Sequence, residues 1–162
     1  MFFWFIGTAI VTVGLVFRDP RFDYRLLIVG SVLPIGDGIF GGARWLHSIT
    51  VSVVLLAVLM IATAGRKPVR KMLLGLPIGM ILHLVFDGAW NNAEVFWWPF
   101  FGLGFDDAPL PITDRGVWSI VLEAVGVALC VWLWRHNRLG DPHRRSAFMR
   151  TGQLDAVPAR FG

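Results

Sequence analysis

The sequence predicts an all-α fold, a polytopic membrane bundle of about five transmembrane segments. Of its 162 residues, 56% are hydrophobic and only 16% are charged, which is more apolar than a soluble domain normally is. The apolar residues fall into long runs, and the basic residues gather in the polar linkers between them. We expect residues 1–138 to form one integral membrane domain and the basic tail, 139–162, to be disordered.

The first two predicted segments differ in regularity. Residues 2–17 are interpreted as a retained helix and not as a signal peptide, because no basic residue precedes the apolar run. Residues 26–43 contain Pro34 and five glycines, so we expect this segment to be broken, with a helix to about Leu33 and irregular backbone beyond it. Asp37 lies in this irregular part, and such backbone is tolerated at membrane depth only where protein or water satisfies it.

The other apolar segments are residues 45–64, 72–90 and 117–134. In the second of these, Pro77 predicts a kink, and Gly75 and Gly79 form a face that permits close helix contact. Between the last two segments, an acidic loop carries a cluster of aromatic residues that we expect at the level of the lipid headgroups. The chain has 1 cysteine, which excludes an intrachain disulfide.

The basic residues predict the orientation. Of the 15 Lys and Arg residues, all except Arg44 and Arg115 lie in the linker 18–25, the loop 65–71 or the segment from Arg135 to the end of the tail. Because cytoplasmic loops carry the excess of positive charge, we expect five crossings with the N-terminus outside and the C-terminus in the cytoplasm. These basic residues cluster at the ends of apolar segments and are interpreted as topology signals, so the expected partners are membrane lipids and not nucleic acid.

Ionisable residues inside the apolar segments mark the candidate site. His83 and Asp87 lie four residues apart, which puts both side chains on one face of a helix, roughly 6 Å apart at Cβ. The predicted topology brings Asp37, His47 and Glu123 to a comparable depth beneath the outer surface. Since a charged side chain is costly in a membrane, such residues normally face a bundle interior or a wet cavity and have a functional role.

Two imidazoles and two carboxylates suit a divalent transition metal, zinc first, with iron or manganese as alternatives. The predicted metal ligands are Asp37, His47, His83 and Asp87. His83 and Asp87 are also the predicted catalytic residues, with Glu123 as an alternative general base to Asp87. Arg44 and Ser48 are the predicted substrate-binding residues, Arg44 because its guanidinium can hold a phosphate.

Each of these residues also has a structural alternative. Asp37 can cap the turn after Pro34, and His47 can be a hydrogen-bonded or interfacial histidine near a helix end. His83 and Asp87 can form a hydrogen-bonded structural pair. Ser48 can bond a backbone carbonyl, and Glu123 can extend outward or pair with Arg115.

Several motifs resemble one family. VLPIGD (residues 32–37), RWLHS (44–48), GMILHLVFDG (79–88) and WWPF (97–100) are similar to motifs of the YdjM-like bacterial inner-membrane proteins, which are described as metal-dependent hydrolases. The resemblance spans about residues 26–102. It implies a multi-pass protein of the bacterial inner (plasma) membrane. The residues that match positions of the family's motifs are Asp37, His47, Ser48, His83 and Asp87.

The chain departs from the family pattern at two potential ligands. Ile35 stands where the family has its first aspartate, and the family's earlier histidine falls near Gly42. Leu46 replaces a threonine. The remaining residues favour one metal over a two-metal site.

Two functions remain open from the sequence. The first is a membrane-embedded metal-dependent hydrolase acting at the outer leaflet on a lipid-linked ester or phosphoester. The second is a non-enzymatic accessory or lipid-binding scaffold subunit, in which the same polar residues form a structural network. A proton or ion path is disfavoured, because the cytoplasmic halves of the segments are nearly free of polar residues.

Overall fold

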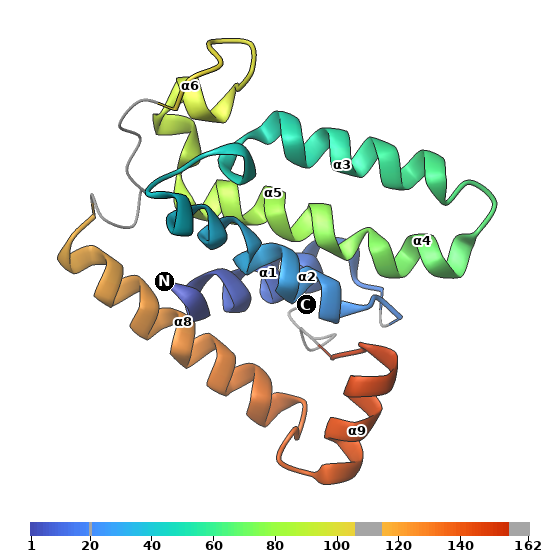
Figure 1. Ribbon diagram of the computed structural model, residues 1–162. Helices are drawn as coiled ribbons and strands as arrows, with labels where there is room; N and C mark the ends of the chain where they lie inside the picture. The colour runs from blue at the N-terminus through green and yellow to red at the C-terminus, as the bar shows by residue number, and fades with distance from the viewer. Residues whose placement is uncertain (20, 106–114, 156–162) are drawn as a thin grey trace.

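The computed structural model describes residues 1–19, 21–105 and 115–155, and every regular element in these ranges is helical, without a strand (Figure 1). The predicted all-α class is thus confirmed. The elements in chain order are α1 (Phe2–Phe17), α2 (Tyr24–Val32), the 3₁₀ helices η1 (Leu33–Phe40) and η2 (Trp45–His47), α3 (Ile49–Ala62), α4 (Lys67–Leu73), α5 (Gly75–Asp87), η3 (Ala89–Asn91), α6 (Ala93–Phe96), α8 (Val117–His136) and α9 (Pro142–Thr151).

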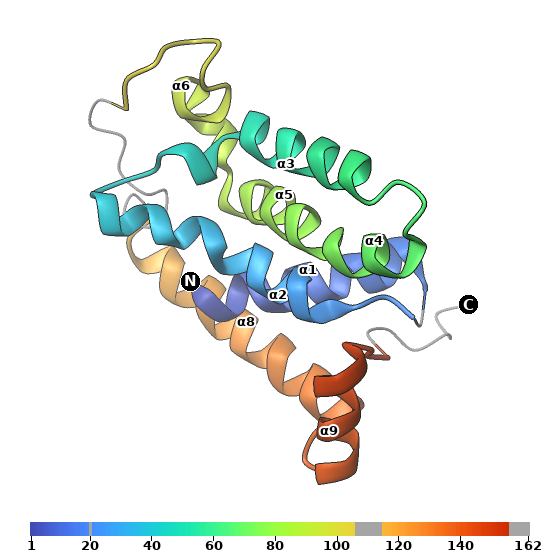
Figure 2. The ribbon, with the colours of Figure 1, turned by 45° about the vertical axis from the view of Figure 1, so that its right-hand side comes forward.

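Helix α5 is the element around which the others pack. It contacts α1, α2 and α3, and in both ribbon views it lies between α2 and α3, with α8 on the far side of α1 (Figures 1 and 2). Helix α4 precedes α5, with an interruption only at Leu74. This break agrees with the predicted effect of Pro77, which has no N–H for the carbonyl of Leu73.

Glycines let α2 and α5 approach closely. A Cβ on Gly79 would collide with the backbone of α2 at Leu27, and one on Gly75 would lie 2.9 Å from the Leu27 nitrogen. Gly30 faces α5 in the same way, against the carbonyl of Leu76. The face of small residues predicted from Gly75 and Gly79 therefore lies against another helix of the same chain, where it lets the backbones of α2 and α5 approach closely.

The second segment changes its helix type where the sequence predicted a break. Helix α2 ends at Val32 and the backbone continues as η1, with Pro34 in its first turn. The segment is therefore not one straight α-helix. The expectation of irregular backbone after Leu33 is corrected, since the chain remains helical in the tighter 3₁₀ form up to Phe40.

Helices α1 and α8 form a second close pair. Gly126 of α8 lies against the backbone at Trp4, and a Cβ on Gly7 would lie 2.9 Å from the Cβ of Leu129. The buried core beside this pair draws residues from α1, α2, α8 and the end of the chain: Ala9, Ile10, Val13, Tyr24, Leu27, Leu133 and Leu154.

Two helical stretches are long and apolar enough to cross a membrane, Lys67–Asp87 with 21 residues and Val117–His136 with 20. Helices α1 and α3 are also apolar but have 16 and 14 residues. Helix α2 has 9. Within the described residues the structure therefore provides two candidate spans, and the arrangement with five crossings stays a prediction.

The expectation of a disordered tail is corrected for its described part. Residues 142–151 form α9, and Gly152 accepts a backbone hydrogen bond of 2.8 Å from Tyr24 at the start of α2. Leu154 is buried in the core. A basic composition predicts solvation, but here Gly152 and Leu154 contact the start of α2 and the core, and Arg25 bonds the carbonyl of Met149 within α9.

Candidate metal centre

The side chains of His47, His83 and Asp87 meet in the interior of the fold. One ligand atom from each lies within 4.8 Å of the others, and all three residues are buried. The Oδ2 atom of Asp87 lies 3.5 Å from Nε2 of His47 and 4.0 Å from Nε2 of His83. The predicted pairing of His83 with Asp87 across one helical turn is thus present, and His47 joins it from another segment.

Asp37 fixes the ring of His47. Its Oδ2 atom accepts hydrogen bonds from the backbone N–H groups of Arg44, Leu46 and His47, at 2.9, 3.1 and 3.2 Å. The same oxygen lies 2.9 Å from Nδ1 of His47. A carboxylate only accepts, so Nδ1 carries a proton, and Nε2 is the ring nitrogen that faces the cluster.

His83 is oriented by a backbone carbonyl instead. Its Nδ1 atom donates to the carbonyl oxygen of Ser31 at 2.7 Å, which again leaves Nε2 as the atom that faces Asp87. In the 3₁₀ pattern that carbonyl would bond the N–H three residues later, at Pro34, which has none. The proline that changes the helix type also frees an acceptor for the histidine.

Asp87 is held at the end of α5 by a cation. Arg115 reaches it with Nη1 at 3.4 Å from Oδ1, and its Nη2 atom donates to the backbone carbonyl of Asp87. Among the described residues, Oδ1 of Asp87 is the buried side-chain polar atom without a hydrogen-bond partner. A buried oxygen of this kind normally has a partner, and it lies on the residue whose other oxygen faces two imidazoles.

The predicted ligands therefore separate into two roles. His47, His83 and Asp87 form the cluster, whereas Asp37 lies behind His47 and bonds its far nitrogen. Metal-binding histidines usually donate their other N–H to a carboxylate or a carbonyl, which fixes the tautomer and the ring orientation. Asp37 and the Ser31 carbonyl provide these two partners.

The other predicted site residues have contacts elsewhere. Glu123 accepts hydrogen bonds from the backbone N–H groups of Phe2, Phe3 and Trp4, so it caps the start of α1 and is not part of the cluster. Ser48 caps α3 through the Thr50 N–H and donates to the carbonyl of Trp98 at 2.9 Å, which is the structural alternative considered for it.

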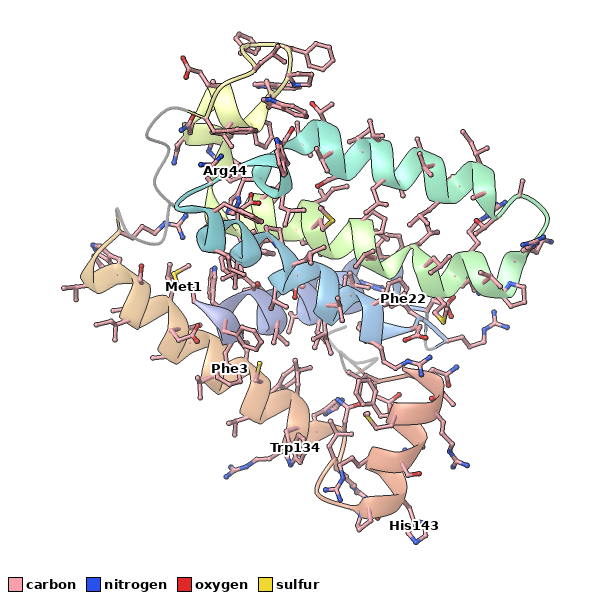
Figure 3. All side chains as sticks on the ribbon, viewed as in Figure 1. Met1, Phe3, Phe22, Arg44, Trp134 and His143 are labelled. Atoms are coloured by element: carbon pink, nitrogen blue, oxygen red, sulfur yellow. The ribbon has the colours of Figure 1, made fainter. Side chains whose placement is uncertain are left out.

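The side chain of Arg44 also has its contacts elsewhere. Its Nε atom donates to the carbonyl of Phe40 at 3.1 Å, and its guanidinium carbon lies 5.8 Å from the centre of the Phe105 ring. Figure 3 shows Arg44 on the same side of the fold as Met1 and away from Phe22 and His143. The cation that reaches the cluster is Arg115. The sequence offered a signal for it, because Arg44 and Arg115 are the two basic residues outside the basic linkers and the segment from Arg135 to the end of the tail.

The donor set fits a divalent metal ion. Two neutral imidazoles and one carboxylate are the ligands that three-residue zinc sites use, and iron or manganese accept the same atoms. The fold and the cluster thus define an all-helical protein, with two helices that can cross a membrane and a buried His-His-Asp group that can hold a metal. Comparison with models of known protein families, with curated proteins and with solved structures gives no match.

Proposed function

We propose that this chain is a membrane-embedded metal-dependent hydrolase that acts on a lipid-linked ester or phosphoester at the outer leaflet of a bacterial inner membrane. The observation that carries the proposal is the convergence of the two Nε2 atoms on the carboxylate of Asp87, with each Nδ1 atom already hydrogen-bonded elsewhere. A divalent ion held by these three residues would polarise the ester or phosphoryl group and would lower the pKa of water at the site.

In this proposal His47, His83 and Asp87 hold the metal, and Asp37 positions His47. The zinc assignment rests on the donor atoms, with iron or manganese as alternatives. Glu123 is occupied as a helix cap, so its role as general base is not carried forward. Asp87 remains the carboxylate beside the reacting groups.

Exposed apolar residues support the location in a membrane. Helix α8 is apolar, and Trp118 and Ile120 on it are both 70% exposed. A helix that is apolar and exposed on several faces suits contact with lipid tails better than with water. Near the candidate site, Ile39, Phe100 and Leu103 are strongly exposed and suit the headgroup region.

The arrangement of charge supports the orientation. Lys71 of α4 pairs with Asp19 of the first linker at 3.2 Å, and Arg25 donates to the carbonyl of Met149 in α9 at 2.9 Å. The three basic segments therefore meet at one end of the fold, as the inner end of a membrane protein requires. His83 and Asp87 lie toward the other end of α5. The resemblance to YdjM-like proteins agrees with this arrangement.

A second candidate is a non-enzymatic scaffold or accessory subunit. It is favoured by the close contacts within the group itself, since Nε2 of His47 lies 3.5 Å from Oδ2 of Asp87, near enough for a direct ion pair. In that case the polar residues stabilise the helix packing, and a metal has no part in it.

Metal analysis of the detergent-purified full chain separates the two candidates. The hydrolase predicts about one transition-metal ion per chain, and a melting temperature that falls when a chelator removes it. His47→Ala and His83→Ala should each abolish the bound metal, while Ser48→Ala keeps it. A wild-type protein with no stoichiometric metal and no response to chelator would establish the scaffold.

Reporter fusions test the orientation independently. A phosphatase that is active only outside the cytoplasm should be inactive after Gly162 and active when inserted at residue 104. The reverse pattern would contradict both the orientation and the outer-leaflet assignment.

A further inference from the structure

Arg115 is the one cation that contacts the candidate metal centre within the described residues. Its Nη1 atom lies 3.4 Å from Oδ1 of Asp87, whereas the imidazole contacts are to the other oxygen, Oδ2. The side chain of Asp87 is 3% exposed, whereas that of Arg115 is 24% exposed. The guanidinium therefore extends from the buried carboxylate to the surface of the fold.

The backbone turns at the end of α5, where Nη2 of Arg115 donates to the carbonyl of Asp87. Gly88 has φ of 61°, in the left-handed region, and ends the helix. A Cβ at Gly88 would lie 3.4 Å from Nη2 of Arg115. That distance is an ordinary van der Waals contact, so the left-handed backbone, and not the guanidinium, is what favours glycine at this position.

The charges of the loaded centre favour an anionic ligand. One divalent ion would balance the carboxylates of Asp37 and Asp87, and both ligating imidazoles would be neutral. The positive charge of Arg115 then remains in excess. A neutral ester gains little from that charge, whereas a phosphate gains a charge-assisted and often bidentate hydrogen bond from guanidinium.

We propose that Arg115 and the metal centre form one binding site for a phosphate group, so that the substrate is a phosphoester and not a carboxylic ester. This inference rests on the proposed function, and it replaces Arg44 as the phosphate-binding residue. Arg44 already bonds the Phe40 carbonyl and covers the Phe105 ring. The guanidinium of Arg115 has five N–H donors, of which its contacts with Asp87 use a part.

The test is calorimetric titration of inorganic phosphate into the full chain, purified in detergent and loaded with one equivalent of zinc. Arg115→Gln should weaken phosphate binding by about 10-fold or more and leave the zinc content unchanged. Arg115→Lys should lose less, because it keeps the charge but not the planar fork. The matched control, Arg44→Gln, should bind phosphate like the wild type.

Several results would overturn this inference. Wild-type protein that binds zinc but not phosphate would contradict the phosphate site and would leave the proposed metal site unaffected. Equal phosphate affinity in wild type and Arg115→Gln would also contradict the phosphate site. If Arg115→Gln lost its zinc, Arg115 would be a positioning residue for Asp87. An absence of zinc from the wild type would instead remove the proposed function itself.

A competition arm distinguishes the sources of the phosphate. Zinc-loaded protein in nanodiscs of phosphatidylcholine is compared with protein in nanodiscs that contain phosphatidic acid. A lipid phosphomonoester in the site would abolish the heat of phosphate binding only in the second set, whereas a ligand free in solution would leave that heat equal in both. Either result supports the phosphate site when the Arg115→Gln dependence holds.

Discussion

Two carboxylates, each paired with an arginine, lie near opposite ends of the α2 and α5 pair. Asp23, at the start of α2, accepts from the backbone N–H and Nε of Arg25 at 3.0 Å each and from its Nη2 at 2.6 Å. Asp87, at the end of α5, has a single arginine contact of 3.4 Å on Oδ1 and two imidazoles near Oδ2.

The difference lies in how completely each carboxylate is satisfied. Both oxygens of Asp23 have hydrogen bonds from Arg25, and the residue also caps α2. Oδ1 of Asp87 has none from the described residues. Because a buried polar group without a partner is costly, a structural role explains Asp23 fully, whereas the hydrogen bonds of the described residues leave Oδ1 of Asp87 unaccounted for.

The largest expected effect comes from exchanging these two carboxylates for amides. Asp87→Asn should weaken metal binding by at least ~100-fold, because a site of three protein ligands has none to spare. Asp23→Asn should leave metal binding unchanged. Competition with a chelator measures the metal affinity of both variants. An equal loss of affinity in the two would show that metal binding depends on the overall stability of the fold and not on Asp87 as a ligand.

Asp37→Asn should have an intermediate effect. Asp37 bonds the far nitrogen of His47, and removal of such a partner typically costs about 10- to 100-fold in metal affinity. The same competition assay measures it beside Asp87→Asn. A loss as large as that of Asp87→Asn would instead make Asp37 a direct ligand, as the sequence predicted.

The sequence identified the cluster because its signals are local. His83 and Asp87 are one helical turn apart, and His47 stands out as an imidazole at the start of an apolar segment. The role of Asp37 is not local, since it depends on the chain folding back so that the N–H groups of Arg44, Leu46 and His47 point at its carboxylate. Its position could be predicted, but its function as a partner of His47 could not.

Arg115 and the tail were missed for a related reason. Arg115 meets Asp87 across 28 residues of sequence, beyond a loop whose path no periodicity indicates. The tail has the composition of a solvated segment, and its attachment depends on Gly152 and Leu154 meeting the start of α2 and the core. Both contacts join distant segments, and composition carries no information about them.

The attachment of the tail gives the third prediction. Gly152 has φ of 69°, and a Cβ there would collide with the carboxylate of Asp23. Gly152→Ala should therefore cost more than the ~1–2 kcal/mol that left-handed backbone costs an alanine. Gly65→Ala is the matched control, because Gly65 has φ of 78° and no atom within 4 Å of its Cβ position.

Chemical unfolding in detergent compares the two glycine variants. The excess destabilisation in Gly152→Ala measures the contact with Asp23, and protease should then cut first within residues 142–155. Equal destabilisation in the two variants would mean that α9 is not held against the start of α2.

The smallest expected effect is the pH dependence of the Asp23 pair. Burial raises the pKa of Asp23, but the hydrogen bonds and charge of Arg25 outweigh it, so the pKa lies below its ordinary value. Such a carboxyl stabilises the fold above its unfolded pKa of about 3.9, and the stabilisation is lost as the pH falls through the lower, folded pKa. At pH 7 Asp23→Asn should cost about 0.5–1 kcal/mol.

Unfolding free energies of wild type and Asp23→Asn between pH 7 and 3 check this sign. The gap between them should be constant down to about pH 4 and narrow below it, as the wild-type carboxyl takes up its proton. If the difference in unfolding free energy persisted at the lowest pH, the destabilisation in Asp23→Asn would come from the shape or the N–H donors of the amide and not from the lost charge. The ion pair with Arg25 would then not be what satisfies Asp23, and the contrast with Asp87 would no longer hold.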